Sequence, residues 1–226
     1  NELTFKNLVC KVKVFYRNPV SHQKPGLKTN QMIIIKEAGT LAGYIDREKA
    51  NGKPIGFVPT LGALHAGHMA LVGHSVQAGF TVCSIFVNPT QFNNAADYRK
   101  YPNIIENDIA LLAPAGTDIL FLPPVEEIYP GGTGGLENYD LGYLETVLEG
   151  KYRPGHFQGV CQVMHRLLTM VKPHNLYMGL KDYQQCMVVK RLLELMKSDI
   201  ELVGYPTVRE SDGLAMSSRN LRLPPA

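Results

Sequence analysis

Short apolar runs alternate along the chain with longer stretches whose apolar positions recur at the spacing of a helix. The run at 81–87 is almost continuously apolar, which is typical of a parallel strand covered on both faces. We therefore predict a Rossmann-like α/β fold, with a parallel sheet and helices on both faces. The predicted strands are 32–35, 55–58, 81–87, 118–122, 176–178 and 200–203, with a strand-like piece at 207–209, and the predicted helices are 38–49, 66–78, 101–113, 160–171 and 184–197.

A strand-turn-helix unit at residues 55–78 organises the rest of the chain. The strand is predicted to end at Pro59, and Gly79 suits a helix C-terminal cap. In the turn between them, Gly62 and Gly67 allow the backbone to approach a ligand closely. Such a unit points bare N–H groups and the positive end of the helix dipole at whatever lies above the turn, so it predicts a phosphate site.

His65 and His68 lie three residues apart at the start of that helix, so they share one face. The helix dipole disfavours extra positive charge there, and we expect both imidazoles to be largely neutral and able to donate an N–H to a phosphoryl oxygen. The pattern alone also fits two surface histidines that happen to lie near a turn. Zinc is disfavoured because no third ligand follows at a plausible spacing.

A second strand-turn-helix unit spans residues 176–197. Its turn places Lys181 beside a helix N-terminus, an electrostatic misfit unless an anion lies there to satisfy the charge. Near the end of the chain, Ser217, Ser218 and Arg219 put two hydroxyls and a guanidinium in series. This set suits a polyphosphate, although a solvated polar turn would have the same residues.

Polar residues also follow the apolar run at 81–87. Asn88 and Gln91 fall where the loops of an open α/β sheet form the binding crevice, or equally in a proline turn with solvated amides. His156 precedes a helix, where a structural role near the cap is the commoner outcome. The glycines of 131–135 lack the context of a dinucleotide fingerprint, and the sequence has no G-x-x-x-x-G-K-[ST] phosphate loop.

Composition narrows the class of protein. The 226 residues carry a formal charge of +3, from 23 basic and 20 acidic residues, which is too small to favour nucleic acid as a partner. Without a membrane-length apolar stretch or a visible signal peptide, we expect a soluble, cytoplasmic protein with no membrane partner. We expect two parts, an extension of unknown role at 1–31 and a Rossmann-like domain at 32–226. The four cysteines, expected to be free thiols, are Cys10, Cys83, Cys161 and Cys186.

Five motifs together give the sequence a close resemblance to the pantothenate synthetase (pantoate–β-alanine ligase) family, from residue 32 to the chain end. They are Pro59-Thr60-Leu61-Gly62-Ala63-Leu64-His65-Ala66-Gly67-His68, Phe86-Val87-Asn88-Pro89-Thr90-Gln91-Phe92, Arg153-Pro154-Gly155-His156-Phe157, Gly179-Leu180-Lys181-Asp182-Tyr183-Gln184-Gln185 and Met216-Ser217-Ser218-Arg219-Asn220. Any one of them is weak, whereas five in the family's order and spacing are very specific.

The resemblance implies an adenylate-forming nucleotidyltransferase and an AMP-forming ligase that makes a carbon–nitrogen bond. Residues 32–226 would then be its Rossmann-like nucleotide-binding catalytic domain. ATP and pantoate would give a pantoyl-adenylate and pyrophosphate, with Mg²⁺, and β-alanine would then release AMP and pantothenate. A homodimer is also implied. The resemblance leaves the magnesium ligands unassigned, and Glu106 and Asp108 are only conceivable metal-side acids.

Roles carry over by motif. The resemblance implies His68 as the proton donor, with His65 holding phosphates and Lys181 contacting the transferred phosphoryl group. Asp182 would bind the ribose, and Val208 would contact adenine through its backbone. The implied ATP-binding set is Leu61, Gly62, Ala63, Leu64, His65, Ala66, Gly67, His68, Gly179, Leu180, Lys181, Asp182, Val208, Met216, Ser217, Ser218 and Arg219. The implied set for pantoate and β-alanine is Gln91 and Gln185, with Asn88, Arg153 and His156 as further candidates.

Three departures from the family pattern bear on activity. Ala66 and Leu180 stand where the family usually has glutamate, and the chain stops at Ala226, where family members continue into a small C-terminal lid domain. We therefore expect either a truncated chain or a form that leaks adenylate. Two alternatives stay open: another nucleotidyltransferase of the superfamily with a different acceptor, and a silent nucleotide-binding module.

Overall fold

The computed structural model describes residues 32–92, 98–99, 101–102 and 104–222, and the expectations for 1–31 lie outside them. Its centre is a sheet whose six strands all pair in parallel, in the order β1-β4-β3-β2-β5-β6. The predicted parallel sheet is thereby confirmed. The strands are β1 (Ile33–Ile35), β2 (Ile55–Thr60), β3 (Phe80–Ile85), β4 (Ile119–Phe121), β5 (Asn175–Gly179) and β6 (Glu201–Tyr205).

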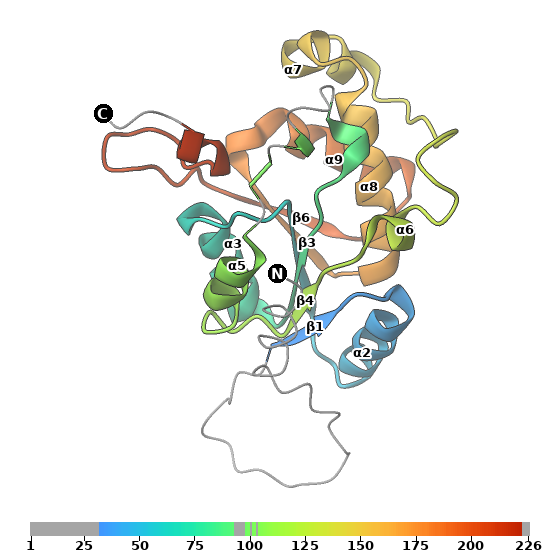
Figure 1. Cartoon of the computed structure of the whole chain (residues 1–226). Helices are drawn as coiled ribbons and strands as arrows, with labels where there is room; N and C mark the ends of the chain where they lie inside the picture. The colour runs from blue at the N-terminus through green and yellow to red at the C-terminus, as the bar shows by residue number, and fades with distance from the viewer. Residues whose placement is uncertain (1–31, 93–97, 100, 103, 223–226) are drawn as a thin grey trace, which may run out of the picture.

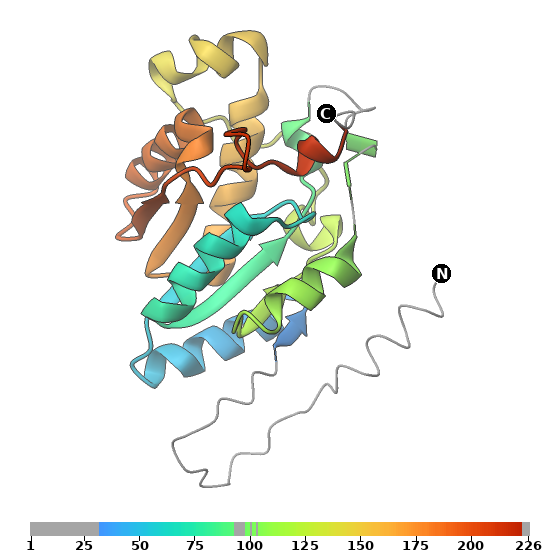
Figure 2. The same ribbon diagram turned by 90° about the vertical axis from the view of Figure 1, so that its left-hand side faces the viewer.

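Helices cover both faces of this sheet, as Figure 1 and Figure 2 show. One core contains buried side chains of α2, α8 and α9, and the other contains buried side chains of α3 and α5. The α-helices are α2 (Ala38–Ala50), α3 (Ala66–Ala78), α5 (Ile105–Leu112), α6 (Val125–Ile128), α7 (Leu148–Tyr152), α8 (His156–Val171) and α9 (Tyr183–Leu195). Short 3₁₀ turns are η1 (Pro89–Gln91), η2 (Gly142–Glu145), η3 (Leu180–Asp182) and η4 (Ser218–Arg222).

Alternating side chains of the central strands fill these two cores. Phe57 and Val82 pack into the core of α2, α8 and α9, while their neighbours Val58 and Cys83 pack into the core of α3 and α5. All four are fully buried. Both faces of β2 and β3 are therefore apolar, which explains why these strands appear in the sequence as continuous rather than alternating runs.

Several predicted boundaries are wrong. β2 continues through Pro59 because its pairing with β5 covers only Gly56 and Phe57, so the missing N–H falls where the strand has one neighbour. The helix predicted at 101–113 begins only at Ile105. The strand-like piece at 207–209 reduces to a single antiparallel bridge between Arg209 and Ala215.

Two further helix ends differ from expectation. α8 begins at His156, four residues before the predicted start at Val160, because Gly155 takes a left-handed conformation there and turns the chain into the helix. Gly79 does end α3, but its φ of 165° is extended rather than left-handed. A Cβ at Gly79 would lie 2.4 Å from the carbonyl oxygen of Pro54, so close packing is what requires glycine.

The cysteines of the described residues are free and buried: Cys83, Cys161 and Cys186. Burial raises the pKa of each thiol, to about 11 for Cys186 and to about 12 for Cys161. They therefore act as small apolar side chains of the core. No helix within the described residues is long and apolar enough to cross a membrane.

Candidate active site

A cavity of about 500 Å³ opens at the carboxyl edge of the sheet. Its walls come from the segments that follow β2, β3, β5 and β6, together with η4 and one side of α8. The chain leaves β2 toward β3 on one side, and it returns to place β5 on the other side. Ligands of open α/β proteins bind at such a point, where the strand order reverses.

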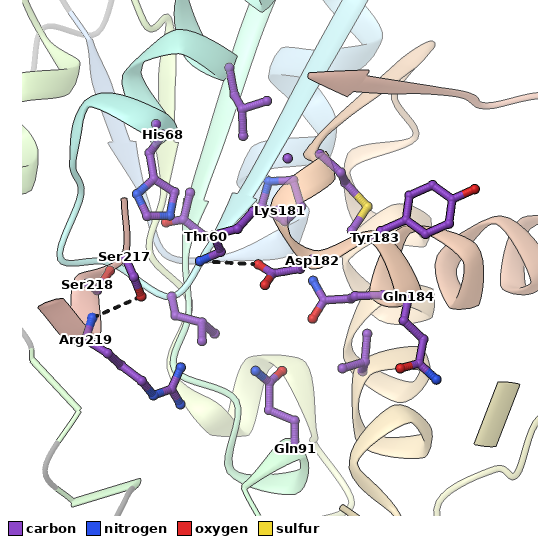
Figure 3. A pocket seen from close by; sticks show the side chains of 18 of the residues that line it. Thr60, His68, Gln91, Lys181, Asp182, Tyr183, Gln184, Ser217, Ser218 and Arg219 are labelled. Carbon is purple, nitrogen blue, oxygen red and sulfur yellow. Dashed lines mark hydrogen bonds and ion pairs between the residues drawn. The ribbon is translucent and has the colours of Figure 1, made fainter. Parts of the chain in front are cut away.

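Most of the predicted site residues line this one cavity. They are Leu61, His65, Gly67, His68, Asn88, Gln91, Arg153, His156, Gly179, Lys181, Asp182, Gln185, Val208, Met216, Ser217, Ser218 and Arg219. Figure 3 shows Ser217 and Arg219 to one side of Lys181 and Asp182, with Gln91 below them. Gly62, Ala63, Leu64, Ala66 and Leu180 lie outside the lining. Leu180 instead packs toward Gly204, where a Cβ would come within 2.8 Å of its side chain.

The turn between β2 and α3 is held by side chains beneath it. The Thr60 hydroxyl accepts a hydrogen bond from the Gly62 N–H and donates one to the carbonyl of Ser84. Gly62 has a φ of 84°, and Ala63 follows with a φ of 50°, a conformation that residues with a side chain rarely adopt. The backbone is thus bent sharply before the helix starts.

The ring of His65 caps the N-terminus of α3, and the ring of His68 caps the backbone N–H of His65. The Gly67 N–H donates to His65 Nδ1 at 3.1 Å, and the His65 N–H donates to His68 Nδ1 at 3.3 Å. Because each Nδ1 accepts, each neutral ring carries its proton on Nε2. The ring centroids are 4.0 Å apart, so the rings lie against each other where they line the cavity.

Both rings resist protonation, as the sequence predicted, but burial is the leading cause rather than the helix dipole. Burial lowers the pKa of His65, and the charge of Lys181 lowers it further. Burial lowers the pKa of His68 to about 3, with smaller contributions from His65 and Lys181. The cavity therefore presents two neutral N–H donors beside a lysine charge.

The turn between β5 and α9 supplies that charge. Lys181 Nζ lies 3.6 Å from a carboxylate oxygen of Asp182, and both side chains remain partly exposed, at 33% and 57%. The side chain of the N-cap residue of α9, Asp182, makes no capping hydrogen bond. The positive misfit noted in the sequence is thus partly compensated by Asp182, while the helix N-terminus stays open to an anion.

A network of amides and rings positions Gln91. Asn88 is completely buried, and its Nδ2 donates to Gln91 Oε1 at 3.2 Å and to the Gly159 carbonyl at 3.0 Å. His156 donates from Nδ1 to the Gln91 carbonyl at 2.8 Å, because its Nε2 faces the guanidinium of Arg153 at 3.2 Å. Asn88 and His156 thus hold Gln91, and Arg153 reaches the cavity beside them.

The chain after β6 crosses back over the cavity. The Met216 N–H donates to the Val208 carbonyl, and the Arg209–Ala215 bridge holds this excursion together. At the start of η4, the hydroxyl of Ser217 accepts from the Arg219 N–H at 3.2 Å. Ser218 is different: it is only 7% exposed and its hydroxyl donates to the Ala63 carbonyl at 2.9 Å.

Sequence reasoning missed one wall and one support. The wall is the apolar side of α8, formed by Val160, Val163, Met164 and Leu167. Their helical spacing marked them only as core residues, although the stripe lies directly after the Arg153–His156 motif. The support is Asp108, whose carboxylate accepts from the N–H groups of Ala63 and Leu64; nothing in its local sequence indicates those partners, which lie 45 and 44 residues away.

The fold and site together define a Rossmann-like α/β protein with a cleft at the carboxyl edge of its sheet, lined by imidazole, lysine, serine and arginine side chains. The family model described as pantoate-beta-alanine ligase matches residues 33–226. The chain belongs to this family.

Relatives agree with that assignment. The pantothenate synthetase of Bacteroides fragilis is 51% identical over 193 residues, covering 85% of this chain and 68% of the relative. The crystal structure of pantothenate synthetase from Thermus thermophilus has a TM-score of 0.79 at 47% identity, covering 86% of this chain and 68% of that one. The Francisella tularensis pantoate-beta-alanine ligase, complexed with beta-gamma ATP and beta-alanine, has a TM-score of 0.81 at 42% identity, covering 85% and 74%.

Proposed function

We propose that residues 32–226 form the catalytic domain of an ATP-dependent ligase that joins pantoate and β-alanine into pantothenate through a pantoyl-adenylate. A carboxylate oxygen of pantoate attacks the α-phosphorus of ATP, and the bond to the bridging oxygen breaks to release pyrophosphate. The amine of β-alanine then attacks the acyl carbon, loses a proton and displaces AMP. Family membership and the names of the relatives support this reaction.

The observation that carries the proposal is the convergence of donors on one cavity. Two neutral imidazoles, the Lys181 ammonium, the Ser217 hydroxyl and the Arg219 guanidinium all line it. A carboxylate is a poor nucleophile toward a negatively charged phosphate, so catalysis must come from orientation and from neutralising charge on the departing pyrophosphate. Each charge-assisted hydrogen bond would contribute about 1.5–3 kcal/mol.

The neutral state of the histidines fits this chemistry. In our proposal, Nε2–H of His68 and of His65 donate to phosphoryl oxygens, and His68 also serves as the proton donor. The free ring is neutral, with a pKa of about 3, and the charge of the bound triphosphate would raise that pKa so that the ring takes up a proton from solvent. The ring would pass this proton to the departing pyrophosphate and become neutral again. Lys181 would contact the phosphoryl group being transferred.

We propose the cavity wall of η1 and α9 as the acceptor side. Gln91 and Gln185 line it and offer amide groups that fit the hydroxyl and carboxylate of a small hydroxy acid rather than a nucleotide-sugar or phospholipid precursor. Asn88 and His156 would act here by holding Gln91. Asp182 and Val208 would contact the ribose and adenine of the nucleotide.

Magnesium enters the proposal as part of the MgATP substrate. No group of three or more His, Cys, Asp or Glu side chains that could hold a metal occurs among the described residues, and Asp182 is already paired with Lys181. The proposal therefore leaves Mg²⁺ with waters and substrate phosphates as its main ligands, which is its usual habit. From the family resemblance alone we further propose a homodimer in the cytoplasm.

The experiment that tests the proposal is release of pyrophosphate from ATP by the intact chain. With pantoate but no β-alanine, we expect pantoate-dependent release of at least about one pyrophosphate per active site: retention of the adenylate gives a burst that stops there, and leakage of the adenylate gives continued slow release. Adding β-alanine should give turnover with equal AMP and pyrophosphate. Release that another acid supports better than pantoate would favour a different acceptor. ATP binding without pyrophosphate release, even at high protein concentration, would show a silent nucleotide-binding module instead.

A further inference from the structure

Two buried side chains from distant parts of the chain hold the backbone of one residue in the β2–α3 turn. Asp108, in the first helical turn of α5, is 1% exposed, and Ser218, at the start of η4, is 7% exposed. We propose that Asp108 and Ser218 are positioning residues that clamp the backbone of Ala63 from both ends. The clamp joins the β2–α3 turn, which leads into His65 and His68, to the segment Ser217–Arg219. The two segments thereby form one rigid phosphate-binding unit.

The first half of the clamp is the Asp108 carboxylate. Its two oxygens accept from the N–H groups of Ala63 at 2.9 Å and Leu64 at 2.7 Å. The turn is built closely around it, since a Cβ at Gly62 would lie 3.1 Å from Oδ2. Both oxygens thus have backbone partners, and the side chain serves the turn rather than a ligand or a metal.

The second half of the clamp is the hydroxyl of Ser218, which donates to the Ala63 carbonyl at 2.9 Å across 155 residues of sequence. The adjacent hydroxyl, that of Ser217, makes its contact with the Arg219 N–H instead. The two serines of one motif therefore have different roles. Ser217 faces the cavity as a donor, whereas Ser218 ties the loop that carries both of them to the opposite wall.

The clamp explains how Ala63 keeps its left-handed φ of 50°. Such a conformation is costly for a residue with a Cβ, so it persists only where surrounding contacts determine it. Three residues later α3 begins, with His65 as its N-cap. A shift of the Ala63 backbone would therefore move His65 and His68 relative to the phosphates they are proposed to bind.

This inference rests on the proposed function for its kinetic consequence but not for its structural one. In Ser218→Ala, we expect amide hydrogen exchange of the segment 61–66 to rise several-fold in the ligand-free chain. We also expect the KM for ATP in pyrophosphate release to rise roughly tenfold, the effect of one buried hydrogen bond. If the exchange rate of 61–66 and the KM for ATP both stay within about twofold of the parent values, the clamp is overturned. Loss of one buried hydrogen bond should change each quantity by more than that.

Matched variants separate the clamp from general damage. Thr169→Ala removes an exposed hydroxyl that also donates to a backbone carbonyl, on α8, and should leave both quantities unchanged. Ser217→Ala should leave the exchange of 61–66 unchanged while weakening ATP use. Faster exchange in Ser217→Ala as large as in Ser218→Ala would show that any change in η4 loosens the turn, which contradicts the clamp.

Asp108→Asn tests whether the two residues act together. It keeps the size of the side chain but leaves one acceptor oxygen for two N–H groups. Because both residues hold the backbone of Ala63, the double variant should raise the KM for ATP by less than the product of the single effects. Multiplicative effects would show independent sites and contradict the clamp. If the parent chain shows no pantoate-dependent release, the proposed function fails, and hydrogen exchange in Ser218→Ala still decides the clamp.

Discussion

The two strand-turn-helix units of this molecule lie side by side, on the parallel neighbours β2 and β5, yet they are built differently. The β2–α3 turn is capped by His65, supported by Asp108 and Ser218, and offers neutral N–H groups. The β5–α9 turn has no side-chain cap and offers Lys181, a charge on a flexible stem. Similar backbone architecture thus supports a preorganised donor set in one unit and an adjustable charge in the other.

Under the proposed reaction, the difference suggests a division of work between the two turns. Fixed dipoles stabilise developing charge without reorganisation, so they have to be placed in advance by the fold. A lysine is a compact point charge with rotatable donors, and it follows a group that moves. The neutral histidines and the charged lysine therefore complement each other, since two further charges beside Lys181 would repel it.

Removing the charge is expected to have the largest effect. Lys181→Ala should lower the rate of pantoate-dependent pyrophosphate release on the order of 10³-fold, because the departing charge loses its cation. The side chain is partly exposed, so the thermal midpoint should stay near that of the parent. Lys190→Ala removes an exposed lysine of α9, the helix that follows η3, and this matched control should keep the parent rate. A parent-like rate in Lys181→Ala would remove its role.

The buried histidines should make the fold sensitive to acid. The pKa of His68 is about 3 in the folded chain against an ordinary 6.5, so the unfolded chain binds the proton first as pH falls. Stability should therefore be fully present above about pH 6.5 and decline as the pH falls from there toward 3. Over this range, His68 alone should lower the free energy of unfolding by up to about 1.4 kcal/mol for each unit by which the pH falls.

Urea unfolding at about pH 7.5 and about pH 5.0, on either side of the ordinary histidine pKa, measures that decline. His68→Gln should flatten it by removing one contribution, while the lowered pKa values of His65 and His156 leave part of it in place. His74→Gln removes an exposed imidazole from the same helix as a comparison. If stability declines equally between the two pH values in the parent protein, His68→Gln and His74→Gln, then His68 is not held neutral by burial.

The smallest effect should come from adding one methyl group to each turn. A Cβ at Gly67 would lie 2.9 Å from His65 Cε1, so Gly67→Ala should displace that ring and raise the KM for ATP several-fold, on the order of one hydrogen bond. A Cβ at Gly179 would meet nothing within 4 Å, and Gly179→Ala should leave the thermal midpoint unchanged. Equal changes of the KM for ATP and of the thermal midpoint in Gly67→Ala and Gly179→Ala would contradict the contrast between the two turns.

The sequence was informative about the elements of the sheet and about residues with chemical side chains in recognisable spacing. His65, His68 and Lys181 could be found because a glycine-containing turn follows a buried strand in each unit. Strand and helix ends were less predictable, because Pro59 in β2 depends on which neighbour a strand faces and Gly79 depends on Pro54. Both boundaries depend on tertiary contacts, which the local sequence does not show.

The residues that hold the site in place could not be predicted from the sequence, for the same reason. Asp108 looks like any acid in the first turn of a helix, and its partners become visible only when α5 is packed beside the β2–α3 turn. Ser218 looks like a second copy of Ser217, and only the fold shows that it faces the Ala63 carbonyl. Asn88 likewise has the pattern of a ligand-binding amide, and only its complete burial shows that it supports Gln91.

The apolar side of α8 has a consequence for how such a catalyst could be retuned. The proposed nucleotide-handling groups come from turns and from the starts of helices, whereas Val160, Val163 and Met164 come from the middle of one regular helix. Under the proposed reaction, volume changes at these three positions would reshape the wall beside Gln91, because α8 packs against η1, and would thereby alter which acid fits. Acceptor choice is in this sense modular, and a small library on a single helix is enough to explore it.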